Sequence, residues 1–429
     1  MIAQKAIGNG STLKRHWRVP PPLLRDAQAP GPEGLNVIRE LSSQLGATLW
    51  KSLRSVLLWA RVSPQERKGL FPPEAHDRRV AGILSLEAEP ELEEPLLTLS
   101  EVLSKPDEAD PEAVGLACSR VGRWADREGH PLTAVEFYQA AALTCPADAR
   151  HALQVGRAVR DRAQYSRAEA WLQRAVGLGR QARDWDTYIR AYIALGKMMR
   201  QRGTYPAARR NLLKALRRAT RQGLRNVEGM ALHDLFVLED ECGNEAEARK
   251  YAAGAVRAYG QGHRLLPALA HDVAYFWLQR GYYDQALPVF FQVLPRVSGT
   301  HRTVALGSLA RAAGASGDEQ SHDWAGSLLF EAEEGPGLAE AWVEAARGAV
   351  ALERWDDARI AAGRAEALAR RRGEEKVRYL AEGVLQSVDS EERARQHRQQ
   401  RPHPKEADEE TRELARALVS TLQASPVPR

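Results

Sequence analysis

Residues 118–175 read CSRVGRWADREGHPLTAVEFYQAAALTCPADARHALQVGRAVRDRAQYSRAEAWLQRA, and one pattern of small and apolar residues occurs in this stretch twice. In the first copy, Val121 and Gly122 are followed by Ala134 and Tyr138. Thirty-four residues later the same places hold Val155, Gly156, Ala168 and Leu172. Small residues at such places let two antiparallel helices approach closely, while the larger apolar neighbours fill the space between them. The stretch therefore predicts two copies of a helix pair.

The pattern continues beyond these copies, with one anchor residue in the second helix of each pair. The anchors are Ala134, Ala168, Ala208, Ala248, Ala286, His322 and Ala358, spaced 34 to 40 residues apart. A glycine stands five residues before five of them, where a tight turn between helices needs its conformational freedom: Gly129, Gly203, Gly243, Gly281 and Gly317. Self-similarity at this period indicates a helical repeat array. His322 replaces the expected small residue, so the sixth pair is predicted either to stand apart or to be degenerate.

Because W-x₂-L-G-x₂-Y…A-x₃-F…P is the signature of the tetratricopeptide repeat, the chain resembles that family, in the extended-repeat form of bacterial regulatory proteins. The resemblance implies an all-α fold, a right-handed solenoid of about seven helix pairs with helical caps. It also implies that the first helix of each pair lines a concave groove.

Five segments are predicted along the chain. Residues 1–34 form a disordered arm rich in Gly and Pro, and residues 35–109 form a helical N-terminal cap region, with a dimerisation module as the alternative. The array with its C-terminal capping helix occupies 110–388, and a charged linker follows at 389–412. Residues 413–429 hold an amphipathic helix and tail, which either dock back on the array or recognise the groove of a partner.

Composition and charge restrict the class of protein. No apolar run approaches the roughly 20 residues of a membrane span, and the N-terminus lacks the apolar core of a signal peptide. The three cysteines form neither a CxxC pair nor an even set, which favours a reducing cytoplasmic location. The net charge is only +5, yet 87–112 holds ten acids against one lysine, and 149–225 holds 19 Lys and Arg against four acids.

Motifs that carry chemistry are absent from the sequence. It contains no Walker loop, GxGxxG, GxSxG or HExxH motif and no zinc-type spacing, so neither an enzyme nor a cofactor or metal is expected. His233 and His271 fall on equivalent places of adjacent first helices, but such residues are more often polar residues of a groove than metal ligands.

Cations recur in register on the first helices. The second and third pairs carry three each at steps of seven and three residues, and the middle one of these places also holds an arginine in the first, sixth and seventh pairs. In the fourth and fifth pairs the same place holds Val237 and Tyr275, a less charged and more apolar patch. The predicted partner-binding groove therefore comprises Arg123, Arg150, Arg157, Arg160, Arg190, Lys197, Arg200, Val237, Tyr275, Arg311 and Arg347. A charge run is usually a solvated face, and the arginines on the second helix of the third pair, such as Arg217 and Arg221, are expected to point outward.

These observations predict a non-catalytic scaffold or regulator that binds a protein or peptide partner in its groove. The positive groove residues favour a partner with an acidic segment. The alternative is a nucleic-acid-associated regulator, in which the basic patch of the second and third pairs contacts phosphates. Against this alternative, no DNA-reading motif precedes the array, and aromatic residues are sparse among its cations.

Overall fold

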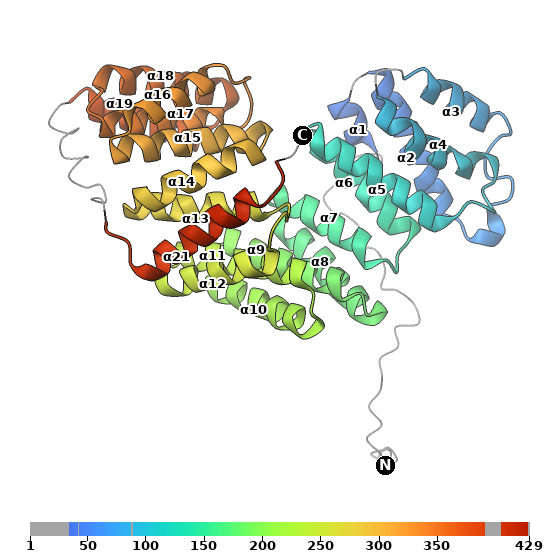
Figure 1. Ribbon diagram of the computed structural model, residues 1–429. Coiled ribbons are helices and arrows are strands. Elements are labelled where there is room, and N and C mark those ends of the chain that lie inside the picture. The colour runs from blue at the N-terminus through green and yellow to red at the C-terminus, as the bar shows by residue number, and fades with distance from the viewer. Residues whose placement is uncertain (1–33, 42, 87–88, 391–404, 428–429) are drawn as a thin grey trace, which may run out of the picture. The chain divides into compact units, whose positions relative to one another are not determined.

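The computed structural model describes residues 34–41, 43–86, 89–390 and 405–427 (Figure 1). Within these ranges every regular element is a helix, and no strand occurs. The chain forms two compact units, residues 1–227 and 228–429, and each is described by itself. The arm predicted at 1–34 lies outside the described residues apart from Gly34, and the predicted linker lies outside them over 391–404.

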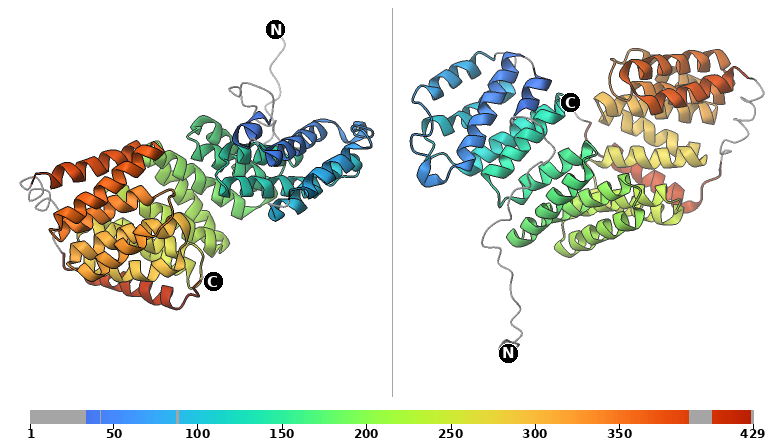
Figure 2. Two further views of the ribbon diagram at one scale, coloured as in Figure 1. Left: turned by 90° about the horizontal axis from the view of Figure 1, so that it is seen from above. Right: turned by 180° about the vertical axis from the view of Figure 1, so that it is seen from behind.

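The first unit contains three helix pairs in the predicted register. α5 (Pro111–Arg127) packs on α6 (Pro131–Thr144), α7 (Ala149–Asp161) on α8 (Tyr165–Ala182), and α9 (Trp185–Gln201) on α10 (Tyr205–Gln222). Figure 2 shows the pairs following one another, and α6 also contacts α7, as α8 contacts α9. An aspartate precedes each first helix of this unit, and its carboxylate accepts hydrogen bonds from backbone N–H groups of the first turn. These N-cap residues are Asp110, Asp148 and Asp184.

Glycines set the distance between the two helices of a pair. A Cβ added at Gly122 would lie 2.6 Å from Tyr138, one at Gly156 would lie 2.7 Å from Leu172, and one at Gly196 would lie 2.6 Å from Leu212. Real carbon atoms in contact stay about 3.5–4.0 Å apart. The seams therefore depend on glycine at this place.

The turns between paired helices follow the predicted pattern. Gly129 and Gly203 adopt φ values of 81° and 71°, in the left-handed region that glycine enters without steric cost. The second and seventh pairs lack glycine there, and Ala163 and Glu353 nevertheless take φ values of 57° and 62°. The turn geometry is therefore common to these pairs even where the residue is unfavourable for it.

The helices before the array cover the first pair. They are α1 (Leu35–Glu40), α2 (Gln44–Arg61), η1 (Pro64–Glu66), α3 (Ala75–Leu84) and α4 (Pro90–Ser104). α1 and α2 contact α6, and α4 contacts α5. The Glu40 carboxylate accepts hydrogen bonds from the backbone N–H groups of Leu132 and Thr133 at the start of α6, at 2.8 and 2.7 Å. Acidic residues near α4 pair with arginines of α5, as Glu91 does with Arg127.

Four more pairs and a closing helix make up most of the second unit. They are α11 (Arg225–Glu241) with α12 (Glu245–Tyr259), α13 (Leu266–Arg280) with α14 (Tyr283–Val293), α15 (Gly299–Ser316) with α16 (Glu319–Phe330), and α17 (Leu338–Ala351) with α18 (Trp355–Arg372). A short η2 (Leu294–Arg296) follows α14, and α19 (Glu375–Val388) packs on α18 and α17 as the closing helix. Across both units, the described chain thus contains the predicted seven pairs.

The sixth pair is formed, despite its unusual anchor. His322 of α16 is buried, and its Nδ1 lies 2.9 Å from the carbonyl oxygen of Ala310 on α15. The ring fits because the facing residue is Gly348 of α17, where an added Cβ would lie 2.8 Å from His322 Nδ1. Glycine on one helix therefore makes room for the larger anchor on another.

The C-terminal helix docks on the second unit. α21 (Glu409–Gln423) packs on α12, α13 and α14, and buries Leu414, Leu418 and Leu422 (Figure 1). Asp408 caps it by accepting from the Thr411 N–H at 2.9 Å. The helix begins at Glu409, four residues before the predicted start at 413. Its apolar spacing predicted a helix, but the partner surface depends on the tertiary structure.

Candidate interaction surface

The predicted site residues of the first unit begin with two exposed cations at equivalent positions. Arg123 lies on α5 and Arg157 on α7. Burial raises the pKa of the Tyr138 phenol on α6, and both arginine charges act against that rise. The structure therefore brings the two cations close to one side chain, whose hydroxyl donates to Asp126 Oδ2 at 3.1 Å.

Other cations of the predicted stripe are held by neighbouring carboxylates. Arg150 forms hydrogen bonds to both Asp148 oxygens, with Nη2 to Oδ2 at 2.6 Å. Arg160 is buried rather than presented to solvent, and its Nη2 lies 2.6 Å from Asp161 Oδ1. The Arg190 Nε lies 2.5 Å from Asp186 Oδ2, and Lys197 and Arg200 are half-buried on the same helix. The stripe is therefore less positive than the count of cations predicts.

In the second unit, residues at equivalent positions of successive first helices take part in a compact polar cluster. Arg311 of α15 and Arg347 of α17 share the carboxylate of Glu344, with N–O distances of 2.8 and 2.6 Å. Glu344 has a side chain only 8% exposed, whereas the arginines are 22% and 28% exposed. Burial lowers the pKa of Arg311, but Glu344 outweighs it and the net pKa is raised. Two guanidinium groups thus face one carboxylate, which leaves the cluster with a net charge of about +1.

Tyr275 of α13 extends this cluster to a third first helix. Burial raises the pKa of its phenol, and the charge of Glu344 raises it further, while Arg311 and Arg347 lower it. Val237 holds the corresponding place on α11 and is half-buried. The sequence pattern found the arginines and the tyrosine, but it missed Glu344, whose signal is its position three residues before Arg347.

A second polar row joins neighbouring first helices of the same unit. His233 Nε2 lies 2.9 Å from Asp272 Oδ2, and His271 lies 3.4 Å from the other oxygen. His271 Nε2 lies 3.2 Å from Ser308 Oγ on α15. Burial alone raises the pKa of Asp272, but the hydrogen bonds from both histidines outweigh it and lower the pKa. Asp272 thus lies between His233 and His271, which occupy equivalent positions of adjacent first helices, and contacts both. The sequence analysis did not identify Asp272 as a site residue.

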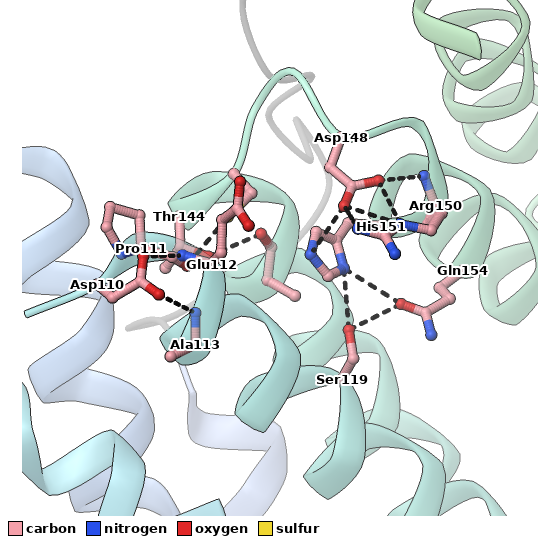
Figure 3. Close-up of polar contacts among 12 residues, drawn as sticks. Asp110, Pro111, Glu112, Ala113, Ser119, Thr144, Asp148, Arg150, His151 and Gln154 are labelled. Atoms are coloured by element: carbon pink, nitrogen blue, oxygen red, sulfur yellow. Dashed lines mark hydrogen bonds and ion pairs between the residues drawn. The ribbon is translucent and has the colours of Figure 1, made fainter. Parts of the chain in front are cut away.

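One Ser–His–Asp arrangement links α5 to α7 in the first unit (Figure 3). Ser119 Oγ lies 3.0 Å from His151 Nδ1 and donates to Gln154 Oε1 at 2.8 Å, while His151 Nε2 is 3.7 Å from Asp148 Oδ2. A nucleophilic serine must give its proton to the histidine. Here that proton goes to Gln154, and Ser119 is 1% exposed. The group is therefore a buried polar link between helices.

Neither metal-site geometry nor a membrane span is found in the part of the chain that the structure describes. Over these residues, no group of three or more His, Cys, Asp or Glu side chains has the arrangement of a metal site. None of the described helices combines the length and the apolar character needed to cross a bilayer.

Comparison with known proteins gives only distant structural similarities. No protein-family model matches the chain, and the search of curated proteins finds no match. Aspartyl phosphate phosphatase F from Bacillus subtilis is 12% identical over 86% of this chain and 98% of its own, with a TM-score of 0.45. A Rap protein complexed with competence and sporulation factor is 12% identical over 80% and 99%, with a TM-score of 0.44. Pseudomonas aeruginosa pilF is 16% identical over 52% and 92%, with a TM-score of 0.39. At these levels, the all-α assignment rests on the helix pairs of this chain itself.

Proposed function

We propose that this chain is a non-catalytic cytoplasmic interaction module, a scaffold or regulator, that binds an acidic segment of a protein partner along its first helices. The cluster of Tyr275, Arg311, Glu344 and Arg347 supports the proposal most directly. Three successive first helices contribute to it, so a partner segment that crosses the helices meets a repeating set of polar groups.

The chemistry of this cluster suits a carboxylate of a partner. Each guanidinium has five N–H donors in a planar fork, and one buried carboxylate cannot use those of two arginines. Arg311 and Arg347 retain exposed surface, and both lie near the Tyr275 phenol. A partner carboxylate can therefore receive charge-assisted hydrogen bonds there without displacing Glu344.

Arg123 supplies a second place to test, in the first unit. It is exposed, and in the described part of the chain no carboxylate forms an ion pair with it. Its replacement therefore changes the surface charge without breaking an internal contact.

The test compares partner capture by two variants of equal charge. Arg123→Glu with Arg347→Gln lowers the net charge of the first-helix face by three units, and Lys68→Glu with Lys376→Gln lowers the net charge by three units at exposed places elsewhere. Partners cross-linked to the full chain in source lysate are identified, and the affinity of each purified partner is then measured. We expect the first variant to lose an acidic partner that the second retains. Equal binding by both variants contradicts the proposed surface.

A further inference from the structure

A cavity lined almost entirely by cations lies among α8, α9 and α10 of the first unit. Its volume is about 400 Å³, and its lining comprises Arg180, Tyr188, Lys214, Arg217, Arg218 and Arg221. No carboxylate lines it, and none in the described ranges forms an ion pair with any of these five cations. They differ in this respect from Arg150, Arg160 and Arg190 on the first helices, which are paired with aspartates.

Aromatic side chains of α9 hold two of the cations in place. The Arg218 guanidinium carbon lies 3.7 Å from the ring centroid of Trp185. Lys214 Nζ lies 4.3 Å from the ring centroid of Tyr192 and donates to its hydroxyl at 2.6 Å. The expectation that the arginines of this helix point outward is thus wrong for Arg218, which is half-buried. Cation–π contacts orient these groups before any ligand arrives.

The arrangement on α10 is unfavourable without an anion. Lys214 and Arg218 are four residues apart, as are Arg217 and Arg221, so like charges lie on adjacent turns of one helix face. Such pairs weaken a helix, and here no acidic residue of the lining offsets them. An anion bound in the cavity would neutralise this repulsion, so binding of a negatively charged group there is electrostatically favourable.

We propose that this cavity binds a phosphoryl group carried by a phosphorylated side chain of a protein. A phosphoryl group brings nearly two negative charges and three acceptor oxygens, and therefore suits several cations better than one carboxylate does. Guanidinium groups bind such oxygens in pairs, and Arg180, Arg217 and Arg221 are exposed and accessible for this.

The observations favour a phosphoprotein over a nucleic acid. Proteins that bind single strands present aromatic faces on which bases stack. Here Arg218 lies over Trp185, and Lys214 lies over Tyr192, so cations cover these faces.

The test uses the full chain and three labelled probes. They are a pool of peptides with one phosphoserine between randomised flanks, the same pool without phosphate, and an oligonucleotide of random sequence. Binding is measured by fluorescence anisotropy near physiological ionic strength, about 0.15 M. We expect the phosphorylated pool to bind at least about tenfold more tightly than the other peptide pool. Inorganic phosphate should compete with it.

Two matched variants locate the binding. Arg217→Gln with Arg221→Gln removes two exposed cations of the cavity, and Lys51→Gln with Lys68→Gln removes two exposed cations elsewhere in the same unit. The first variant should lose the preference for phosphate, and the second should keep it. Equal binding of the two peptide pools, failure of inorganic phosphate to compete, or an unchanged first variant overturns the proposal. Tighter binding of the oligonucleotide, with log affinity falling linearly in log salt, overturns it in favour of nucleic acid. The site is independent of the first-helix surface, whose variants leave this cavity intact.

Discussion

Replacing Gly156 by alanine tests the close approach of α7 and α8. The added Cβ would lie 2.7 Å from Leu172 Cδ2, 2.8 Å from its Cγ and 3.2 Å from its backbone nitrogen. Leu172 is fully buried, so its side chain cannot swing into solvent. The two helices must therefore move apart, or Leu172 must leave its preferred rotamer.

The size of the effect follows from two opposing contributions. Extra methyl groups in a well-packed core cost about 1–3 kcal/mol. Alanine also stabilises a helix interior relative to glycine by roughly 0.5–1 kcal/mol. We therefore expect Gly156→Ala to lower the free energy of local opening by about 0.5–2 kcal/mol.

Gly177 of α8 provides the matched control, since no atom outside its own helical turns lies within 4 Å of a Cβ added there. Gly177→Ala should show the helix contribution alone and stabilise by roughly 0.5–1 kcal/mol. Hydrogen exchange of the α7 and α8 amides in the full chain measures local opening free energies, and it avoids assuming a single transition for a repeat array. If the opening free energies of these amides are the same in both variants, α7 and α8 pack less closely than the structure shows, and the reasoning is refuted.

Three further predictions concern a turn and the C-terminal strap. Ala163→Gly should stabilise the second pair by about 1 kcal/mol, because a left-handed conformation costs an alanine roughly 1–2 kcal/mol; thermal unfolding by circular dichroism checks this, and a lower midpoint contradicts it. Leu418→Ala should weaken docking of α21 by about 2–5 kcal/mol, since Leu418 is fully buried; limited proteolysis of the strap measures it, and unchanged cleavage rates argue against docking. Hydrogen bonds from Thr411, with a contribution from Arg249, lower the pKa of Asp408 from 3.8 to about 2. The folded pKa is thus the lower one, so the stabilisation by Asp408 is complete above about pH 4 and is lost as the pH falls toward 2. Cleavage of the strap should rise over that range, and Asp408→Ala should remove this dependence.

The sequence by itself determined the helices, their pairing and the turns between them. These features depend on neighbours a few residues apart, because a helix buries one periodic face and a tight turn needs a left-handed residue. Gly156 facing Leu172 and Gly129 in its turn were both readable from spacing. The unusual anchor His322 also indicated from the sequence that the packing differs in the sixth pair. Only the structure shows that Gly348 of the neighbouring helix makes room for its ring.

The tertiary structure alone decided which charges meet. Sequence spacing placed Arg160 and Arg311 on first helices. In the structure, Arg160 is buried beside Asp161, and Arg311 shares the Glu344 carboxylate with an arginine of the neighbouring first helix. Arg180 joins the cations of α10 from another helix, with no local signal. Ion pairing depends on atoms a few ångströms apart that can be far apart in the chain, and its strength varies with burial. The position of a cation on a helix face is therefore readable from sequence, whereas its availability to a partner is not.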